Sequence, residues 1–95
     1  MDRPNAYAAL AAELALWGGK ARGELVARIG AGPIARKVEL AGEVVWIEVS
    51  VSWVDASRES LIVEATANGP SHWHTERLVE RLIVPGAVTA VVEGL

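Results

Sequence analysis

Residues 44–53 read Val44-Val45-Trp46-Ile47-Glu48-Val49-Ser50-Val51-Ser52-Trp53. From Val45 onward every second residue is apolar, and the residues between them are mostly polar. Because successive side chains of a strand point to opposite faces, this alternation predicts an antiparallel strand with one face on a core and the other in solvent. Trp46 departs from the pattern, since it falls on the polar side.

The segments on either side of this strand carry the same period of two. A turn at 41–43 and a polar stretch at 55–59 separate them from the central strand, and Asn68-Gly69-Pro70 follows the last of them. This arrangement favours a three-stranded meander, to which the short apolar run 88–92 can add an edge strand. The positions expected to face the core are Ile34, Val38 and Leu40 before the central strand and Leu61, Val63, Ala65 and Ala67 after it.

The N-terminal segment predicts a helix. Its apolar stripe, at a spacing of i, i+3, i+7 and i+10, consists of Tyr7, Leu10, Leu14 and Trp17. Asp2 or Asn5 can cap the start, Pro4 suits a first turn, and Gly18-Gly19 ends the helix. A shorter stripe within residues 20–29 favours a second helix.

Residues 71–84 fit two conformations. As a helix capped by Ser71, the segment places Leu78 and Leu82 on one row; as a strand, it puts Glu80 on their face. We expect the helix, which would pack over Trp46 on the outer side of the sheet. The predicted fold is a single α+β domain, residues 1–95. It has an N-terminal helix or helices packed on a three- to four-stranded antiparallel meander, with a further helix near the C-terminus.

Composition limits the classes of function. The chain of 95 residues has length for one core, and it contains no cysteine, which excludes disulfides, thiolate zinc sites and a thiol nucleophile. No stretch approaches the roughly 18 apolar residues of a membrane span. The net charge is -3, and the basic residues of 20–37 lack the interleaved aromatics of a nucleic-acid surface. We therefore expect a soluble, cytoplasmic protein that binds neither nucleic acid nor membrane.

Two short motifs resemble binding sites, one for a metal ion and one for a dinucleotide. In a strand, His72, His74 and Glu76 project to one side, as paired metal ligands do, whereas in the favoured helix they separate. Residues 30–35 match a Gly-x-Gly-x-x-Ala dinucleotide pattern, but strand-like residues follow where that pattern requires a helix. With no oriented nucleophile and base, we expect no enzyme, no cofactor and no metal. The alternative is a small-ligand or metal-binding protein that uses the His72 to Glu76 region.

The first helix points to assembly. Glu13 is its only charged residue between Ala6 and Trp17, and a helix that is apolar all round is usually buried on more than one side. We therefore expect a non-catalytic protein-interaction or assembly module, of accessory, adaptor or inhibitor type, that forms a two-fold homodimer. The candidate interface residues are Ala8, Ala12, Ala15, Leu16, Trp46 and Trp73.

Overall fold

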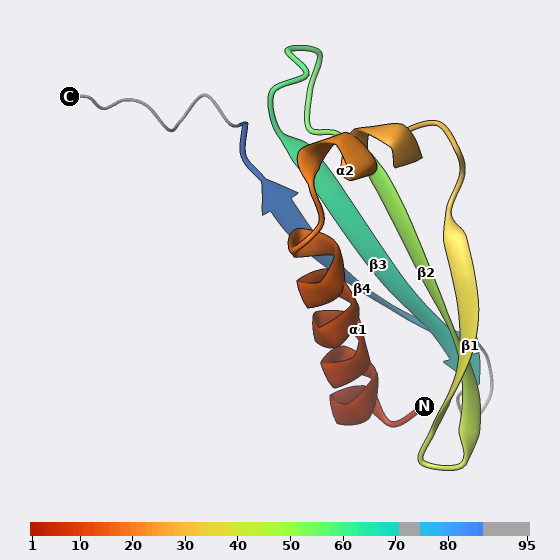
Figure 1. Ribbon diagram of the computed structural model, residues 1–95. Helices are drawn as coiled ribbons and strands as arrows, with labels where there is room; N and C mark the ends of the chain where they lie inside the picture. The colour runs from red at the N-terminus through yellow and green to blue at the C-terminus, as the bar shows by residue number, and fades with distance from the viewer. Residues whose placement is uncertain (71–74, 87–95) are drawn as a thin grey trace.

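The fold is an antiparallel sheet with helices on one of its faces (Figure 1). The structure is a computed structural model, which describes residues 1–70 and 75–86. In chain order the elements are α1 (Arg3–Gly18), α2 (Arg22–Arg28), β1 (Ile34–Leu40), β2 (Glu43–Trp53), β3 (Leu61–Pro70) and β4 (Thr75–Val84). The four strands lie side by side in sequence order. The predicted α+β class, the N-terminal helices and the antiparallel meander are thus confirmed.

The strand register explains the period of two. Val49 of β2 is paired with Ile34 of β1 and with Ala65 of β3, so these side chains point to the same face. We call this face, which carries the helices, the inner face of the sheet. Its buried residues are Val45, Ile47, Val49, Val51, Leu61, Val63, Ala65, Ala67 and Leu78. The hydrophobic core therefore lies between this face and the helices.

Helix α1 begins and ends close to where the sequence predicts. Asp2 caps it, because its carboxylate accepts a hydrogen bond of 3.2 Å from the backbone N–H of Asn5. The buried side of α1 consists of Ala6, Leu10, Glu13, Leu14 and Trp17. Tyr7 is 41% exposed, so its predicted place in the core stripe is wrong. At about 100° per residue, Ala6 is better aligned with Leu10, Leu14 and Trp17 than Tyr7 is.

The helices cover only part of the inner face. Helix α1 packs on β3 and β4, whereas the shorter α2 packs on β2 near the loop that follows it (Figure 1). Arg22 anchors α2, because its Nη2 donates a hydrogen bond of 2.6 Å to the carbonyl oxygen of Glu59 and its guanidinium lies 5.7 Å from the ring centre of Trp53. On β1, Ile34 remains 40% exposed.

The segment predicted as a C-terminal helix forms a strand in its described part. β4 pairs with β3 from Pro70–Thr75 to Leu61–Val84, and thereby satisfies the second edge of β3. Leu78 is buried, whereas Glu80, on the same side of this edge strand, is exposed, so the charge on the apolar side stays in solvent. The sequence 68–70 extends β3 rather than ending it. The expected edge strand 88–92 lies outside the described residues.

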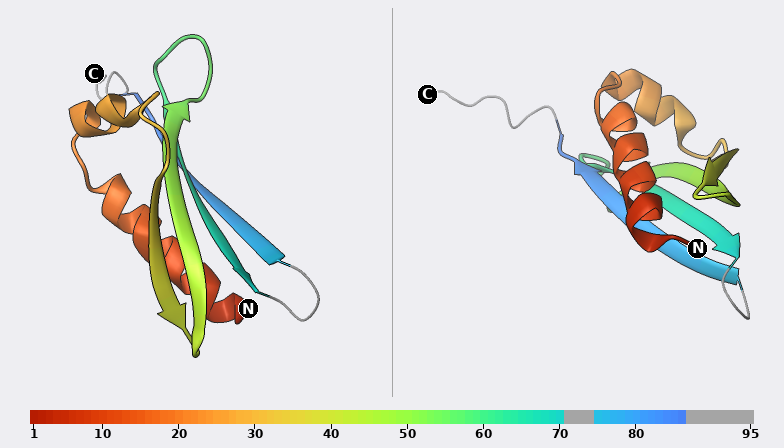
Figure 2. Two further views of the ribbon diagram at one scale, coloured as in Figure 1. Left: turned by 90° about the vertical axis from the view of Figure 1, so that its right-hand side faces the viewer. Right: turned by 90° about the horizontal axis from the view of Figure 1, so that it is seen from below.

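The opposite, outer face of the sheet carries no helix within the described residues (Figure 2). Trp46 lies on this face and is 48% exposed. The predicted cover of Trp46 by a C-terminal helix is therefore wrong, because the described residues assigned to that helix, Thr75–Val84, are the fourth strand of the same sheet.

Candidate functional site

The side of α1 that faces away from the sheet is apolar. Leu16 is 65% exposed and Tyr7 is 41% exposed, and the residues around them are alanines. We define the α1 surface by its exposed residues Tyr7, Ala8, Ala11, Ala12, Ala15 and Leu16. Four of the predicted interface residues, Ala8, Ala12, Ala15 and Leu16, thus lie together on one continuous helix face.

The charge on α1 is turned inward. Glu13 is 8% exposed, and its Oε2 accepts a hydrogen bond of 3.2 Å from the indole Nε1 of Trp17, one turn further along the helix. Its Oε1 accepts two hydrogen bonds from the guanidinium of Arg36 in β1, at 3.2 Å from Nε and 2.7 Å from Nη2. A buried carboxylate needs such partners, because burying it unpaired is strongly unfavourable.

This arrangement leaves the α1 surface without charge. Glu13 is the only charged residue among 4–19, all of which the structure describes. Since Glu13 is buried, no charged side chain of this range faces solvent. The nearest charges stand at the ends: Arg3 forms an ion pair with Glu76 of β4, and Lys20 lies 5.2 Å over the ring of Trp17. An exposed helix face normally carries polar residues, so the uncharged α1 surface is the most unusual feature of the molecule.

Trp46 does not join this surface. It lies on the outer face of the sheet, where Lys37 of β1 approaches within 5.8 Å of the centre of its ring. Val44, on the same face, is 48% exposed. The structure therefore places Trp46 on the opposite side of the sheet from the α1 surface, and Trp73 lies outside the described residues.

The predicted metal-binding alternative is only partly visible. His72 and His74 lie outside the described residues, while Glu76 forms the ion pair with Arg3 and lies 3.9 Å from the amino group of Met1. Within residues 1–70 and 75–86, no three histidine, aspartate or glutamate side chains form a group that could hold a metal ion. The metal hypothesis stays untested at the histidines themselves.

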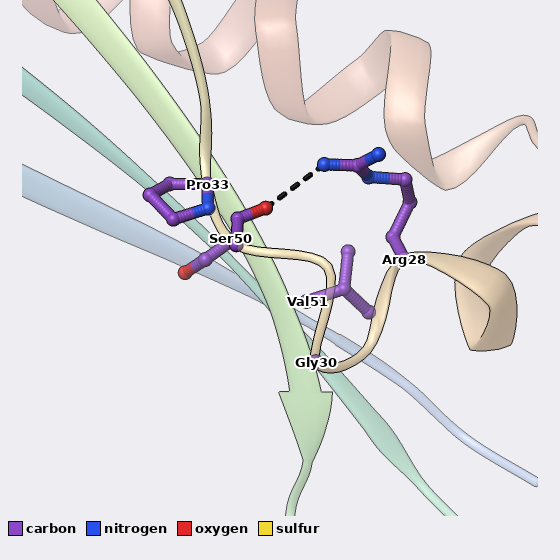
Figure 3. Close-up of a pocket in the computed structure, with 6 residues that line it drawn as sticks. Arg28, Gly30, Pro33, Ser50 and Val51 are labelled. Carbon is purple, nitrogen blue, oxygen red and sulfur yellow. Dashed lines mark hydrogen bonds between the residues drawn. The ribbon is translucent and has the colours of Figure 1, made fainter.

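A hollow of about 300 Å³ lies where α2 leads into β1 (Figure 3). Its lining consists of Arg28, Gly30, Gly32, Pro33, Ser50 and Val51. The guanidinium of Arg28 donates a hydrogen bond of 2.8 Å to the carbonyl oxygen of Gly32, so it holds the connection rather than facing an open site. Gly30 and Gly32 both have positive φ, and the chain continues as strand β1. The dinucleotide-like pattern is therefore a loop between a helix and a strand, as the sequence indicated.

The sequence analysis noted Glu13 as the only charged residue of the first helix but predicted neither its burial nor its partner. Residues 10, 13, 14 and 17 share one side of a helix, and this spacing could have placed the carboxylate toward the core. A basic residue on the inner side of a neighbouring strand is then required. Arg36 stands between Ile34 and Val38 on that side, so the alternation around it carried the signal.

Comparison of the chain with protein-family models, with curated proteins and with solved structures finds no match. Among the described residues, no helix is long and apolar enough to cross a membrane.

Proposed function

We propose that this chain is a non-catalytic protein-interaction and assembly module whose contact face is the α1 surface. The observation that carries the proposal is the absence of any solvent-facing charge along residues 4–19, with Leu16 65% exposed in that range. Interface cores are depleted in charged residues, and exposed apolar patches mark binding sites.

The position of Glu13 supports the same function. A carboxylate at the outer side of α1 would keep the helix soluble, whereas α1 holds its only carboxylate inside, fixed by Trp17 and Arg36. The alanines of the α1 surface permit a close approach of a second element, and Leu16 supplies the apolar anchor that a contact requires.

The test compares two single substitutions with equal change of charge. Ala12→Glu places a carboxylate on the α1 surface, while Ser52→Glu places one on the outer face of β2. Both sites are exposed, so both variants fold. Self-association is measured by size exclusion with light scattering, and binding to other proteins by affinity capture from native lysate. We expect Ala12→Glu to lose the assembly or the captured protein and Ser52→Glu to retain it. Equal behaviour of the two variants contradicts the proposal.

A further inference from the structure

We propose that the partner of the α1 surface is a second copy of this chain, whose own α1 packs over the inner face of β1. This inference rests on the proposed function and names its partner. One helix is narrower than the four-stranded sheet. A helix is about 10 Å wide and strands lie about 4.8 Å apart, so one helix covers about two strands.

The incompletely covered strand of the inner face is β1. Helix α1 packs on β3 and β4 and α2 packs on β2, and the inward residues Val45, Ile47, Val49 and Val51 of β2 are buried. On β1 the inward apolar residues are therefore incompletely buried: Ile34 is 40% exposed, and Val38 and Leu40 are half-buried. Figure 1 shows β1 at the edge of the sheet away from α1.

The electrostatics of the inner side of β1 fit an apolar occupant. The single inward charge of β1 is Arg36, and its guanidinium is already paired with Glu13 at 2.7 Å. An uncharged helix can therefore cover Arg36 without leaving a buried charge unpaired, which is the condition for a favourable contact. The α1 surface is such a helix face, and it belongs to this chain.

The area of a stable interface requires that both the α1 surface and the inner side of β1 take part. Helix α1 has 16 residues. At 1.5 Å per residue it is about 24 Å long and about 10 Å wide, so its outer face has a projected area of roughly 240 Å². A stable interface buries about 800 Å² on each partner. The α1 surface alone falls short of this area. Adding the exposed inner side of β1, which runs beside it for seven residues, brings the interface toward the required size.

A two-fold axis can cover the α1 surface and the inner side of β1 in both copies at once. Let the axis run parallel to α1 in the layer of the helices, midway between α1 and the line above β1. Each sheet is then covered by its own α1 over β3 and β4 and by the partner's α1 over β1. Both helices lie in one layer between two sheets. Closed two-fold symmetry of this kind uses the same patch on both copies.

The axis also fixes which residues meet. An axis parallel to the helices keeps both copies at the same level, and we take Glu13 and Arg36 as the common reference level, because their side chains are hydrogen-bonded. From these residues, Ala15 and Ile34 both lie two positions toward the α2 end, and their levels differ by about 4 Å. Ala15 of one copy should therefore lie near Ile34 of the other. Leu16 lies about one turn from Glu13, at the margin of the α1 surface next to the flank from which Glu13 reaches Arg36, and should lie near its symmetry mate.

The experiment uses the full chain, which contains no cysteine of its own. Ala15→Cys and Ile34→Cys chains, one carrying a size tag, are mixed and oxidised. We expect a mixed disulfide dimer, and also a symmetric one from Leu16→Cys alone. The control mixes Ala15→Cys with Ser52→Cys, whose thiol lies on the outer face. Cross-linking of the control at the same rate as the test pair overturns the inference.

Mass measurements complete the test. By light scattering at micromolar concentration, the unmodified chain should have twice its mass of 10.1 kDa. Ile34→Glu should weaken the dimer by about a hundredfold, because its carboxylate would be buried unpaired, while Ser52→Glu should leave the dimer intact. A monomeric chain, or an Ile34→Glu variant that dimerises like the parent, overturns the inference. If the chain is monomeric but Ala12→Glu loses a captured protein, the proposed function stands and the second copy does not. If Ala12→Glu alters neither mass nor capture, both fail.

Discussion

The pair of Glu13 and Arg36 allows a quantitative test of how the chain keeps its first helix uncharged. The perturbation is a double-mutant cycle with Glu13→Ala, Arg36→Ala and the double variant. Glu13→Ala leaves the buried indole N–H of Trp17 without its acceptor, at a cost of about 1–3 kcal/mol. It also frees Arg36, whose side chain is 56% exposed and returns to water at little cost. We expect a net loss of about 2 kcal/mol in the free energy of unfolding.

Arg36→Ala acts on the other side of the pair. It leaves the Glu13 carboxylate, with only 11% of the side chain exposed, without its cation. Breaking a fully buried pair costs about 3–5 kcal/mol, and we expect about 2 kcal/mol here because the exposed side of Arg36 admits water once the guanidinium is gone. The double variant removes both charges and should lose little more than either single variant. The coupling energy is then about 1–2 kcal/mol.

The assay is urea unfolding at one fixed protein concentration, since assembly would make stability depend on concentration. With a denaturant slope of about 1–2 kcal/mol per molar, each single variant should lower the midpoint by about 1–2 M. Arg28→Ala is the matched control, because its guanidinium donates to the carbonyl oxygen of Gly32 and neutralises no carboxylate among the described contacts. Losses that add within about 0.5 kcal/mol in the double variant refute the reasoning, as do single losses no larger than that of the control.

Three further predictions test the fold and its surface. Val49→Asp should cost about 3–5 kcal/mol because Val49 is 3% exposed on the inner face, whereas Ser50→Asp, on the outer face, should cost less than about 1 kcal/mol; equal midpoints in urea would show the faces reversed. Gly86→Ala should cost about 1–3 kcal/mol in the same assay, because its Cβ would lie 2.9 Å from a backbone oxygen, and an unchanged midpoint speaks against this contact. The hydroxyl and the backbone N–H of Ser57 hold the pKa of Asp55 below its ordinary value. The carboxylate form is thus favoured in the folded state, so this contribution to stability is present above the ordinary pKa and is lost as the pH falls through the lowered one. Ser57→Ala should raise the pKa of Asp55 in an NMR titration, and no change would contradict the assigned cause.

The strands of the meander were predictable because one physical rule fixes them. Every second residue from Val45 to Trp53 needs the core, and no helix can place those residues on one side. Strand β4 was not predictable, because charged and apolar residues share one face in its sequence. Glu80 shares a face with Leu78 and Leu82, which argues against a strand unless that strand is an edge where the carboxylate reaches solvent. Whether a strand is at an edge depends on the whole sheet, and local periodicity carries no information about it.

The α1 surface was predictable because helix periodicity applies to it as strand alternation applies to the meander. Helix periodicity around Leu10, Leu14 and Trp17 determines which alanines face outward. The error at Tyr7 shows the precision of that rule, since a residue at the margin of a stripe can lie on either side of the helix-sheet contact. The uncovered side of β1 was beyond the sequence, because it depends on where α1 crosses the sheet, and that position is set by packing between distant segments.

The distribution of charge favours the proposed assembly through α1 over assembly through the sheet edges. On β1 the neighbouring residues Arg36 and Lys37 place a positive charge on each face of the strand. On β4, Glu80 places a negative charge on the inner face and Arg81 places a positive charge on the outer face. Charges that point inward from an edge oppose the addition of another strand, because the new strand would have to bury them. Since Arg36 is already neutralised by Glu13, strand addition is opposed by Lys37 at the β1 edge and by Glu80 at the β4 edge, whereas the α1 surface carries no such charge. Because both edges carry charge and Arg36 neutralises Glu13, these charges support the proposal that a partner docks on the α1 surface and the adjoining side of β1.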